Sequence, residues 1–428
     1  MTSLTFVSLA VAAGVTVASP LFAQDPPPKD QPVEHVHDME HMDMPMDGAA
    51  PGGWALMQDG NLFVLVNHQG GPRGGDELTA PNWWMGMATH SSARGSLTLT
   101  GMLSLDPATV GTAGYRLLFQ VGEALNQRPI VDRQHPHDLW MQLSASWRVS
   151  LGRATALTLS GGPVGEPALG PPAFMHRASA AAIALAPLSH HTFDSTHVAF
   201  GVATLGVDRG PVTFEASVFN GREPDQRRWD FDFGRMDSVS GRVWFRPAAR
   251  WEMQVSTGHL VAPEQLSHGN LVRTTASATY LDTTNGGLTA ATVGVGMNKA
   301  EDVTRHAVFG EASHVWRRSL VSIRGEIVEV ESALLETGEL PVSVIDEART
   351  AVVGTVTVGV TRDIARLKGV VAAVVVNGTT YRVPPSLHVS HGGHPFSFQV
   401  GLQIRRRESP MGRMWNMHIG GRPMTMEH

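Results

Sequence analysis

The chain contains no cysteine in 428 residues. It therefore has no disulfide bond, no thiolate metal site, no cysteine-based zinc module and no cysteine nucleophile. Charged residues make up only 17% of the sequence, and the formal net charge is −6. No basic stripe runs along the chain, so nucleic acid is not expected as a partner.

Long apolar runs are also missing beyond the N-terminal segment. Residues 2–18 are almost entirely small or apolar, and a small-residue site ends at Ala23. This pattern predicts an export signal over residues 1–23, although no Lys or Arg precedes Lys29. No later stretch is apolar for the ~18 residues that a membrane helix needs. Any membrane insertion would therefore have to use a β-barrel.

From Trp54 onward, apolar and polar residues alternate with a period of two, which is typical of strands and not of helices. The segment from Leu139 to Val149 and the segment from Phe396 to Arg405 both follow this pattern. We predict that a first strand over residues 54–68 pairs with a last strand over residues 396–406. That pairing would close a barrel.

The connections between these segments are alternately short and long. The short ones are rich in Gly, Pro, Asn and charged residues, as hairpin turns require, and cover 90–95, 150–155, 208–211, 246–250, 283–287, 316–319 and 362–366. The long ones lie near 69–81, 106–137, 162–195, 221–235, 261–269, 332–349 and 378–395. This asymmetry predicts an all-β protein: a transmembrane antiparallel β-barrel of about 16 strands, with about 14–18 left open, short periplasmic turns and long extracellular loops.

The chain is thus predicted to have four parts. They are a signal peptide (1–23), a disordered Met/His-rich segment (24–53), an outer-membrane barrel (54–406) and a Met-rich C-terminal tail (407–428). A soluble β-sandwich is the alternative fold. The polar strand faces, rich in Ser, Thr, Gly and Gln, fit a wet lumen better, and very long loops are uncommon in sandwiches.

Residues 34–47 read EHVHDMEHMDMPMD. A thioether binds soft Cu(I), whereas imidazole suits Cu(II), Zn and Ni, and the interspersed carboxylates favour a cation. We predict a copper-binding tract, with a plain linker as the alternative. The predicted ligands are His35, His37, Met39, His41, Met42, Met44 and Met46. Copper is the one cofactor that the sequence suggests.

Histidines also gather in the long loops. His135 and His137 are two residues apart and would face the same side of a strand, and the run 187–197 reads PLSHHTFDSTH. We predict a metal site or pore-mouth site on the loop side, and packing by hydrogen-bonded imidazoles is the alternative. The candidates are His135, His137, Asp138, His190, His191, Asp194, His197, His388, His391 and His394.

Charges of both signs fall on the strand face opposite the apolar one. They would line the pore, either as a transverse field or as a ladder of ion pairs that closes it. The residues are Arg148, Glu215, Arg242, Glu252, Arg324, Glu326 and Arg405.

The Met/His-rich tract followed by a barrel resembles the outer-membrane copper-resistance protein B group. The barrel itself resembles the porin-like outer-membrane barrels of Gram-negative bacteria. The resemblance is one of composition and layout, and no motif-level match extends through residues 54–406. It implies a role in copper tolerance or export at the outer membrane, with membrane lipid and periplasmic copper proteins as partners. The oligomeric state stays open.

We expect no enzymatic activity, because the H-E-x-x-H, G-x-S-x-G and P-loop motifs are absent from the sequence. Two other functions remain open. One is a general diffusion porin whose tract is incidental. The other is a barrel enzyme acting on lipid, for which Ser189, His190 and Ser195 are the candidates.

Overall fold

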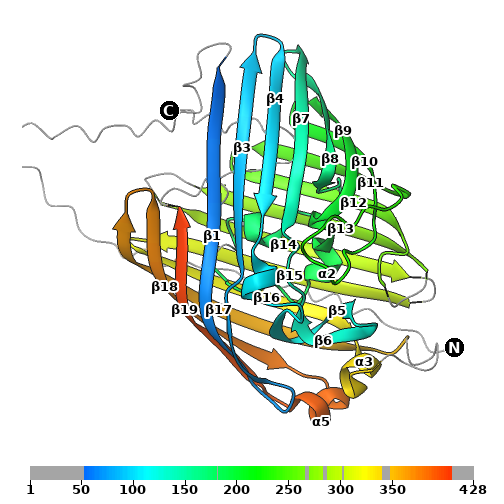
Figure 1. Ribbon diagram of the computed structural model, residues 1–428, viewed down its shortest axis with the longest axis vertical. Helices are drawn as coiled ribbons and strands as arrows, with labels where there is room; N and C mark the ends of the chain where they lie inside the picture. The colour runs from blue at the N-terminus through cyan, green and yellow to red at the C-terminus, as the bar shows by residue number, and fades with distance from the viewer. Residues whose placement is uncertain are drawn as a thin grey trace, which may run out of the picture. The chain divides into compact units, whose positions relative to one another are not determined.

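The computed structural model describes residues 53–180, 182–265, 269–282, 287–300, 303–339 and 348–406. The predicted signal peptide, the Met/His-rich segment except its last residue, and the C-terminal tail lie outside these ranges. Within them the chain is built mainly of long antiparallel strands (Figure 1). No helix in the described part of the chain is long and apolar enough to cross a membrane.

The described strands form a closed barrel. The main sheet has 17 strands, and one of them, β2 (Gly75–Thr79), is a short strand paired with the loop-side end of β1. The other sixteen make the wall. They are β1 (Trp54–Gln69), β3 (Asn82–Ser92), β4 (Gly95–Leu103), β7 (Trp140–Gly152), β8 (Thr155–Gly165), β9 (Ala199–Arg209), β10 (Val212–Phe219), β11 (Ser238–Ala248), β12 (Trp251–Val261), β13 (Asn270–Asp282), β14 (Thr289–Ala300), β15 (Val303–Trp316), β16 (Ser319–Glu331), β17 (Thr350–Leu367), β18 (Val370–Arg382) and β19 (Phe396–Arg406). The predicted fold class and strand number are confirmed.

The barrel closes where β1 meets β19. These strands pair antiparallel from Asn61 opposite Arg405 to His68 opposite Phe398. This is the pairing predicted from the alternation of the first and last strands. Because the number of strands is even, β1 begins and β19 ends at the same, short-turn end of the barrel.

Each wall strand has an apolar outer face and a polar inner face. On β14, Val293 and Val295 are 58% and 54% exposed, whereas Thr292, which precedes Val293, is 1% exposed. The same alternation leaves large apolar side chains exposed on most of the other wall strands. An outward apolar face on a closed barrel is the arrangement that lipid requires.

One predicted turn was misplaced. The segment 362–366, rich in charged residues, was expected to connect two strands, but β17 continues to Leu367 and the turn lies at Lys368 and Gly369. Gly369 has a φ of +78°, which a residue with a side chain adopts reluctantly. The pairing of β17 with β18 shifts register between Asp363 and Ala365, a bulge that keeps this charged segment inside the strand.

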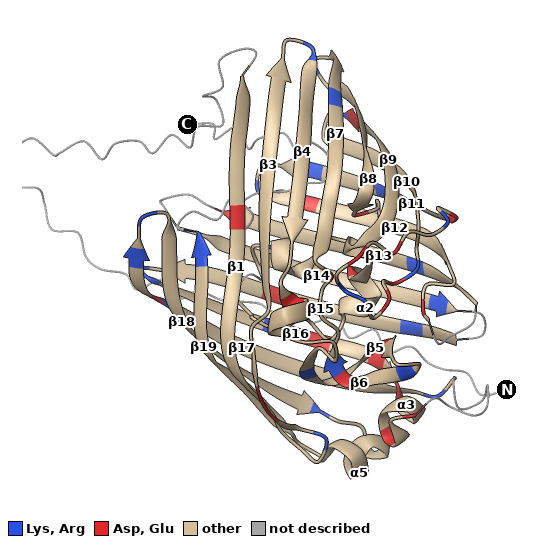
Figure 2. Cartoon of the chain, viewed as in Figure 1, with Lys and Arg blue, Asp and Glu red and all other residues tan. Residues whose placement is uncertain are grey.

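The long connections carry the remaining elements. Between β4 and β7 the chain forms α1 (Asp106–Thr109) and a separate hairpin of β5 (Tyr115–Leu125) and β6 (Arg128–Gln134). The short elements of the other loops are η1 (Phe174–His176), α2 (His190–Phe193), η2 (Ser195–His197), α3 (Ser332–Thr337), η4 (Pro385–Leu387) and α5 (His388–His391). Acidic and basic segments lie close together around α2, β5 and β6 (Figure 2).

Candidate functional site

The loop between β8 and β9, residues 166–198, folds into the barrel; we call it the inner loop. Its backbone bonds directly to inward side chains of the wall. The Ala168 amide donates to Ser217 of β10 at 2.7 Å, and the Gly170 amide donates to Ser256 of β12 at 2.9 Å. On the far side, the Ser189 amide donates to Glu326 of β16 at 2.9 Å. The inner loop therefore crosses the lumen.

Small wall residues admit the inner loop. A Cβ atom added to Gly296 of β14 would lie 2.9 Å from side-chain carbons of both Thr192 and Phe193. Phe193 in turn packs edge-on against Phe309 of β15, with ring centroids 4.7 Å apart. The inner loop thus packs apolar side chains against the wall inside the lumen, in addition to its hydrogen bonds.

An ion cluster fixes the middle of the inner loop. The Arg177 guanidinium donates to Glu311 of β15 and to Asp194, each at 2.7 Å. Arg324 of β16 donates to Glu311 at 3.2 Å, and all four side chains are almost fully buried. Burial alone would raise the pKa of the Asp194 carboxyl, but Arg177 and His190 hold it well below its usual range. Asp194 is therefore a fixed negative charge inside the barrel.

A second segment joins the inner loop in the lumen: the stretch 104–139 between β4 and β7, which we call the hairpin insert. The Tyr115 hydroxyl accepts from the Ala186 amide of the inner loop at 3.0 Å. Phe119 stacks on His391 at 4.4 Å between ring centroids. The Leu118 amide donates to Gln69 of β1 at 3.3 Å. The hairpin insert therefore packs against the inner loop, the loop before β19 and the wall.

Five histidine rings form a continuous row where these two segments meet. Neighbouring ring centroids in the row are 5.3–5.5 Å apart. In order, the rings belong to His137, His197, His190, His191 and His135. Two of them come from the hairpin insert and three from the inner loop, so tertiary folding brings together residues that are distant in sequence.

The environment keeps several of these rings neutral. Burial, with nearby positive charges, lowers the pKa of His135, His191 and His197 well below its usual value. His197 Nδ1 lies 2.7 Å from the Asp194 backbone oxygen, to which it can only donate. Its Nε2 atom then carries a lone pair, and this atom is buried without a hydrogen-bond partner.

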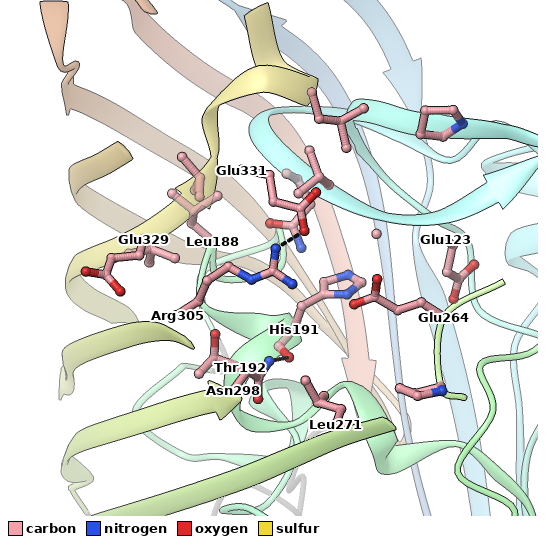
Figure 3. A pocket seen from close by; sticks show the side chains of 18 of the residues that line it. Glu123, Leu188, His191, Thr192, Glu264, Leu271, Asn298, Arg305, Glu329 and Glu331 are labelled. Atoms are coloured by element: carbon pink, nitrogen blue, oxygen red, sulfur yellow. Dashed lines mark hydrogen bonds and ion pairs between the residues drawn. The ribbon is translucent and has the colours of Figure 1, made fainter. Parts of the chain in front are cut away.

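A cavity of about 100 Å³ adjoins this row. His191 lines it together with Glu123, Glu264 and Arg305 (Figure 3). Glu223 is a further lining residue. Arg305 pairs with Glu331 at its edge. The cavity is therefore polar, carries charges of both signs, and has an imidazole in its wall.

The other predicted loop-side residues lie in different contacts. Asp138 pairs with Arg228 at 3.2 Å. His391 is fully buried and lies 2.9 Å from Asp132, and His388 Nε2 lies 3.0 Å from the Val383 carbonyl oxygen. His394 is exposed. The structure thus splits the predicted set into a central group and a separate C-terminal group packed near the β5–β6 hairpin.

The seven predicted pore-lining charges lie on the inner face, and they are largely paired. Glu215 accepts from Arg242, and Glu252 accepts from Arg246 at 2.8 Å. The other contacts are Arg148 with Asp208, Arg324 with Glu311, Glu326 with Ser189, and Arg405 with Asp363. This arrangement is closer to a ladder of ion pairs than to two separated charged walls.

Two other groups of predicted residues do not belong to these clusters. The tract residues His35, His37, Met39, His41, Met42, Met44 and Met46 lie outside the described residues. Ser189 and His190, candidates for a lipid-acting enzyme, are each 1% exposed inside the lumen, and Ser195 accepts from Arg273 there. They do not lie at the lipid-facing rim, which counts against that alternative.

Sequence reasoning missed Arg177, Glu311, Glu123 and Glu223 as site residues. Glu311 could have been found, because it occupies an inward position of an alternating strand. Arg177 is an isolated charge within an otherwise apolar part of a loop, which was a weaker signal. Glu123 and Glu223 carry no local pattern, and only the fold brings them beside the histidines.

His176 predicts a pH dependence of stability. Its ring packs edge-on against Trp83 and its Nδ1 atom has no partner, and burial lowers its pKa to about 3. The unfolded chain takes up this proton near pH 6.5, whereas the folded protein does so only near pH 3. The contribution of the neutral His176 ring to the free energy of unfolding is therefore fully present above about pH 6.5. It is lost as the pH falls, by up to about 1.4 kcal/mol per pH unit.

The variant His176→Gln should make the free energy of unfolding less dependent on pH between pH 6.5 and 4. Urea unfolding in detergent micelles at several pH values measures this slope, and the variant should lack about one proton of uptake. Equal slopes in the two proteins would contradict the expectation.

Comparison with known proteins gives the fold. No family model and no curated protein sequence matches this chain. Among solved structures, Pseudomonas putida OprB has 10% sequence identity and a TM-score of 0.51, covering 83% of this chain and 94% of its own. The anion-selective porin from Comamonas acidovorans has 10% identity and a TM-score of 0.49, covering 82% and 99%. Salmonella typhi OmpF has 10% identity and a TM-score of 0.48, covering 82% and 97%. At this level of identity the likeness shows the fold alone, and that fold is the porin-type barrel.

Proposed function

We propose that this protein is a porin-like channel of the Gram-negative outer membrane, narrowed by its inner loop and hairpin insert, for small polar solutes or ions. The observation that carries the proposal is a closed sixteen-strand barrel, apolar outside and polar inside. A barrel of this size encloses an aqueous space unless its loops fill it. Membrane lipid is then its constant partner.

The inner surface of the barrel favours a narrow path for solutes over a wide one. The inner loop is bonded to wall strands from β10 to β16, and the ion pairs on the wall place both signs of charge along it. Such a lumen favours small hydrophilic solutes over large ones. The balanced charge predicts weak selectivity between cations and anions.

Planar-bilayer recording tests the channel proposal. The full chain, purified from outer membranes and shown to be heat-modifiable on a gel, should give discrete conductance steps and a reversal potential near zero in a KCl gradient. A mock extract from cells lacking the protein is the control. Heat-modifiable protein that gives no steps, even when the inner loop is loosened as described in the Discussion, would overturn the proposal.

Copper binding by the Met/His-rich tract is a second candidate function, which would link the protein to copper tolerance and to periplasmic copper proteins. The observation that favours it is the local density of thioether, imidazole and carboxylate groups in residues 34–47. The porin-like barrel fits the general channel better than it fits a dedicated copper protein. We therefore propose copper binding by the tract as a function in addition to that of the channel.

A peptide of residues 30–50 tests this second function. Titrated with Cu(I) and with Cu(II), it should bind more tightly than an acidic control peptide of the same length in which Met and His are replaced by Ser and Gln. Equal affinities would remove copper binding from the proposal and leave the channel untouched.

A further inference from the structure

Three histidines of the central row converge on one point. One ring nitrogen from each of His135, His190 and His191 lies within 4.8 Å of the others. His135 belongs to the hairpin insert, while His190 and His191 begin α2 of the inner loop. Two segments separated by a complete hairpin of the wall therefore supply one group of imidazoles.

Each of the three rings has a carboxylate behind it. Nδ1 of His135 lies 3.1 Å from Glu123, and Nδ1 of His190 lies 2.7 Å from Asp194. Nδ1 of His191 lies 3.8 Å from Glu223. A carboxylate that holds the proton of one ring nitrogen fixes the tautomer and leaves the other nitrogen as an electron-pair donor. The hydrogen bond between His190 and Asp194 is of this kind, which is the usual outer shell of a histidine that binds a metal ion. Nδ1 of His135 also lies 3.2 Å from the Pro136 carbonyl oxygen, and Glu223 lies beyond hydrogen-bond distance from His191.

We propose that His135, His190 and His191 form a binding site for one divalent transition-metal ion of borderline softness, such as Zn²⁺ or Co²⁺. Three neutral imidazoles with a further position for water or solute are a common ligand set for these ions. A tetrahedral ion at ~2.05 Å from each nitrogen requires the nitrogens to be about 3.3 Å apart. The three nitrogens lie within 4.8 Å of one another, so the side chains would have to rotate to reach that spacing.

Local packing supports this assignment. Gly122 of the hairpin insert lies directly against the His191 ring, where an added Cβ would be 2.3 Å from its Cε1 atom. The unpartnered Nε2 atom of His197 belongs to the next ring of the row, 5.3 Å from that of His190. The cavity of about 100 Å³ reaches His191 and provides the space through which an ion arrives.

Other groups face the three rings as well. Two arginines, Arg228 and Arg273, and the carboxyl groups of Asp194, Glu123 and Glu223 face them.

A bound metal ion would also connect two separate segments of the chain. Because the ligands come from the inner loop and from the hairpin insert, an ion would cross-link the two segments that narrow the lumen. A bound ion should therefore hold the narrowed lumen closed more firmly. Hydrogen-bonded packing without any metal is the competing explanation, and His391, buried beside Asp132, is an example of it in the same protein.

The test uses the full chain with His35, His37 and His41 replaced by Ala, so that the N-terminal tract does not compete. Heat-modifiable protein is dialysed against Zn²⁺ and, separately, titrated with Co²⁺ while its visible spectrum is recorded. The parent should bind one ion in this site and give the intense visible bands of low-coordinate Co²⁺. Zn²⁺ should also raise its Tm.

The variant His135→Gln/His191→Gln should lose those bands and bind Zn²⁺ at least ~100-fold more weakly, and its Tm should not respond to Zn²⁺. The matched control His391→Gln, which alters another buried carboxylate-paired histidine, should behave as the parent does. If the double variant fails to fold, each single replacement must weaken binding, since both rings are partly exposed. Unchanged binding in the folded variants, or no stoichiometric binding by the parent, would overturn the proposal.

Discussion

Replacing Arg177 with methionine should release the inner loop from the barrel wall and raise the single-channel conductance. The methionine keeps most of the side-chain volume but removes the charge that Glu311 and Asp194 share. Removing one partner of a buried ion pair typically costs about 3–5 kcal/mol, because the remaining charge is buried without compensation. Arg177 is 5% exposed, so little of this cost is relieved by solvent.

Two measurements check this expectation. Urea unfolding should show a lower free energy of unfolding, and bilayer recording should show larger or more variable conductance steps. Arg227→Met is the matched control: Arg227 also pairs with a carboxylate, Asp225, but is 73% exposed, and exposed pairs contribute little. A folded Arg177→Met protein with the stability and conductance of the wild type would show that the ion cluster does not hold the inner loop.

Replacing Val293 with arginine should impair assembly of the barrel. Val293 is 58% exposed near the middle of the outer face of β14, where lipid is expected. An arginine on the lipid face at the bilayer midplane destabilises a barrel by about 2–4 kcal/mol, and the cost falls to about 0–1 kcal/mol near the interface. Thr289, on the same face at the short-turn end of β14, therefore provides the matched control as Thr289→Arg.

Heat-modifiability and outer-membrane fractionation measure this difference. The Val293→Arg protein should accumulate less in the outer membrane and unfold at a lower urea concentration than Thr289→Arg. If the two variants behave alike, the outer face does not meet lipid at that depth. The channel proposal would then lose its main physical support.

The comparison of sequence with structure is clearest for β1 and β19. Their alternation predicted both strands and their pairing, because side-chain direction in a strand repeats every two residues whatever the rest of the fold does. The predicted position of the turn after β17 is wrong for a related reason. Asp363 and Arg366 are typical turn residues, yet they lie in the strand, where Asp363 bonds to both Arg366 and Arg405. That stabilising contact involves a strand distant in sequence.

For the long loops, the sequence predicts less and the tertiary structure decides more. The sequence predicts long loops and a metal or pore-mouth site among ten loop-side residues, including His135, His190 and His191. Which histidines would meet could not be derived, because the approach depends on Gly122 and on the carboxylates of Glu123 and Glu223. The C-terminal histidines have a similar sequence signature but pack elsewhere, with His391 against Asp132 and Phe119.

The sequence by itself determined that this protein is a β-barrel with about 16 strands and with short turns at one end. Local periodicity and turn composition are enough for that, since they act over a few residues. Only the tertiary structure decided that the inner loop and the hairpin insert fold into the lumen and bring five histidine rings into a row. The direction in which a loop folds depends on partners such as Glu311 and Glu326 across the barrel, and contacts of that range leave no periodic signal in the chain.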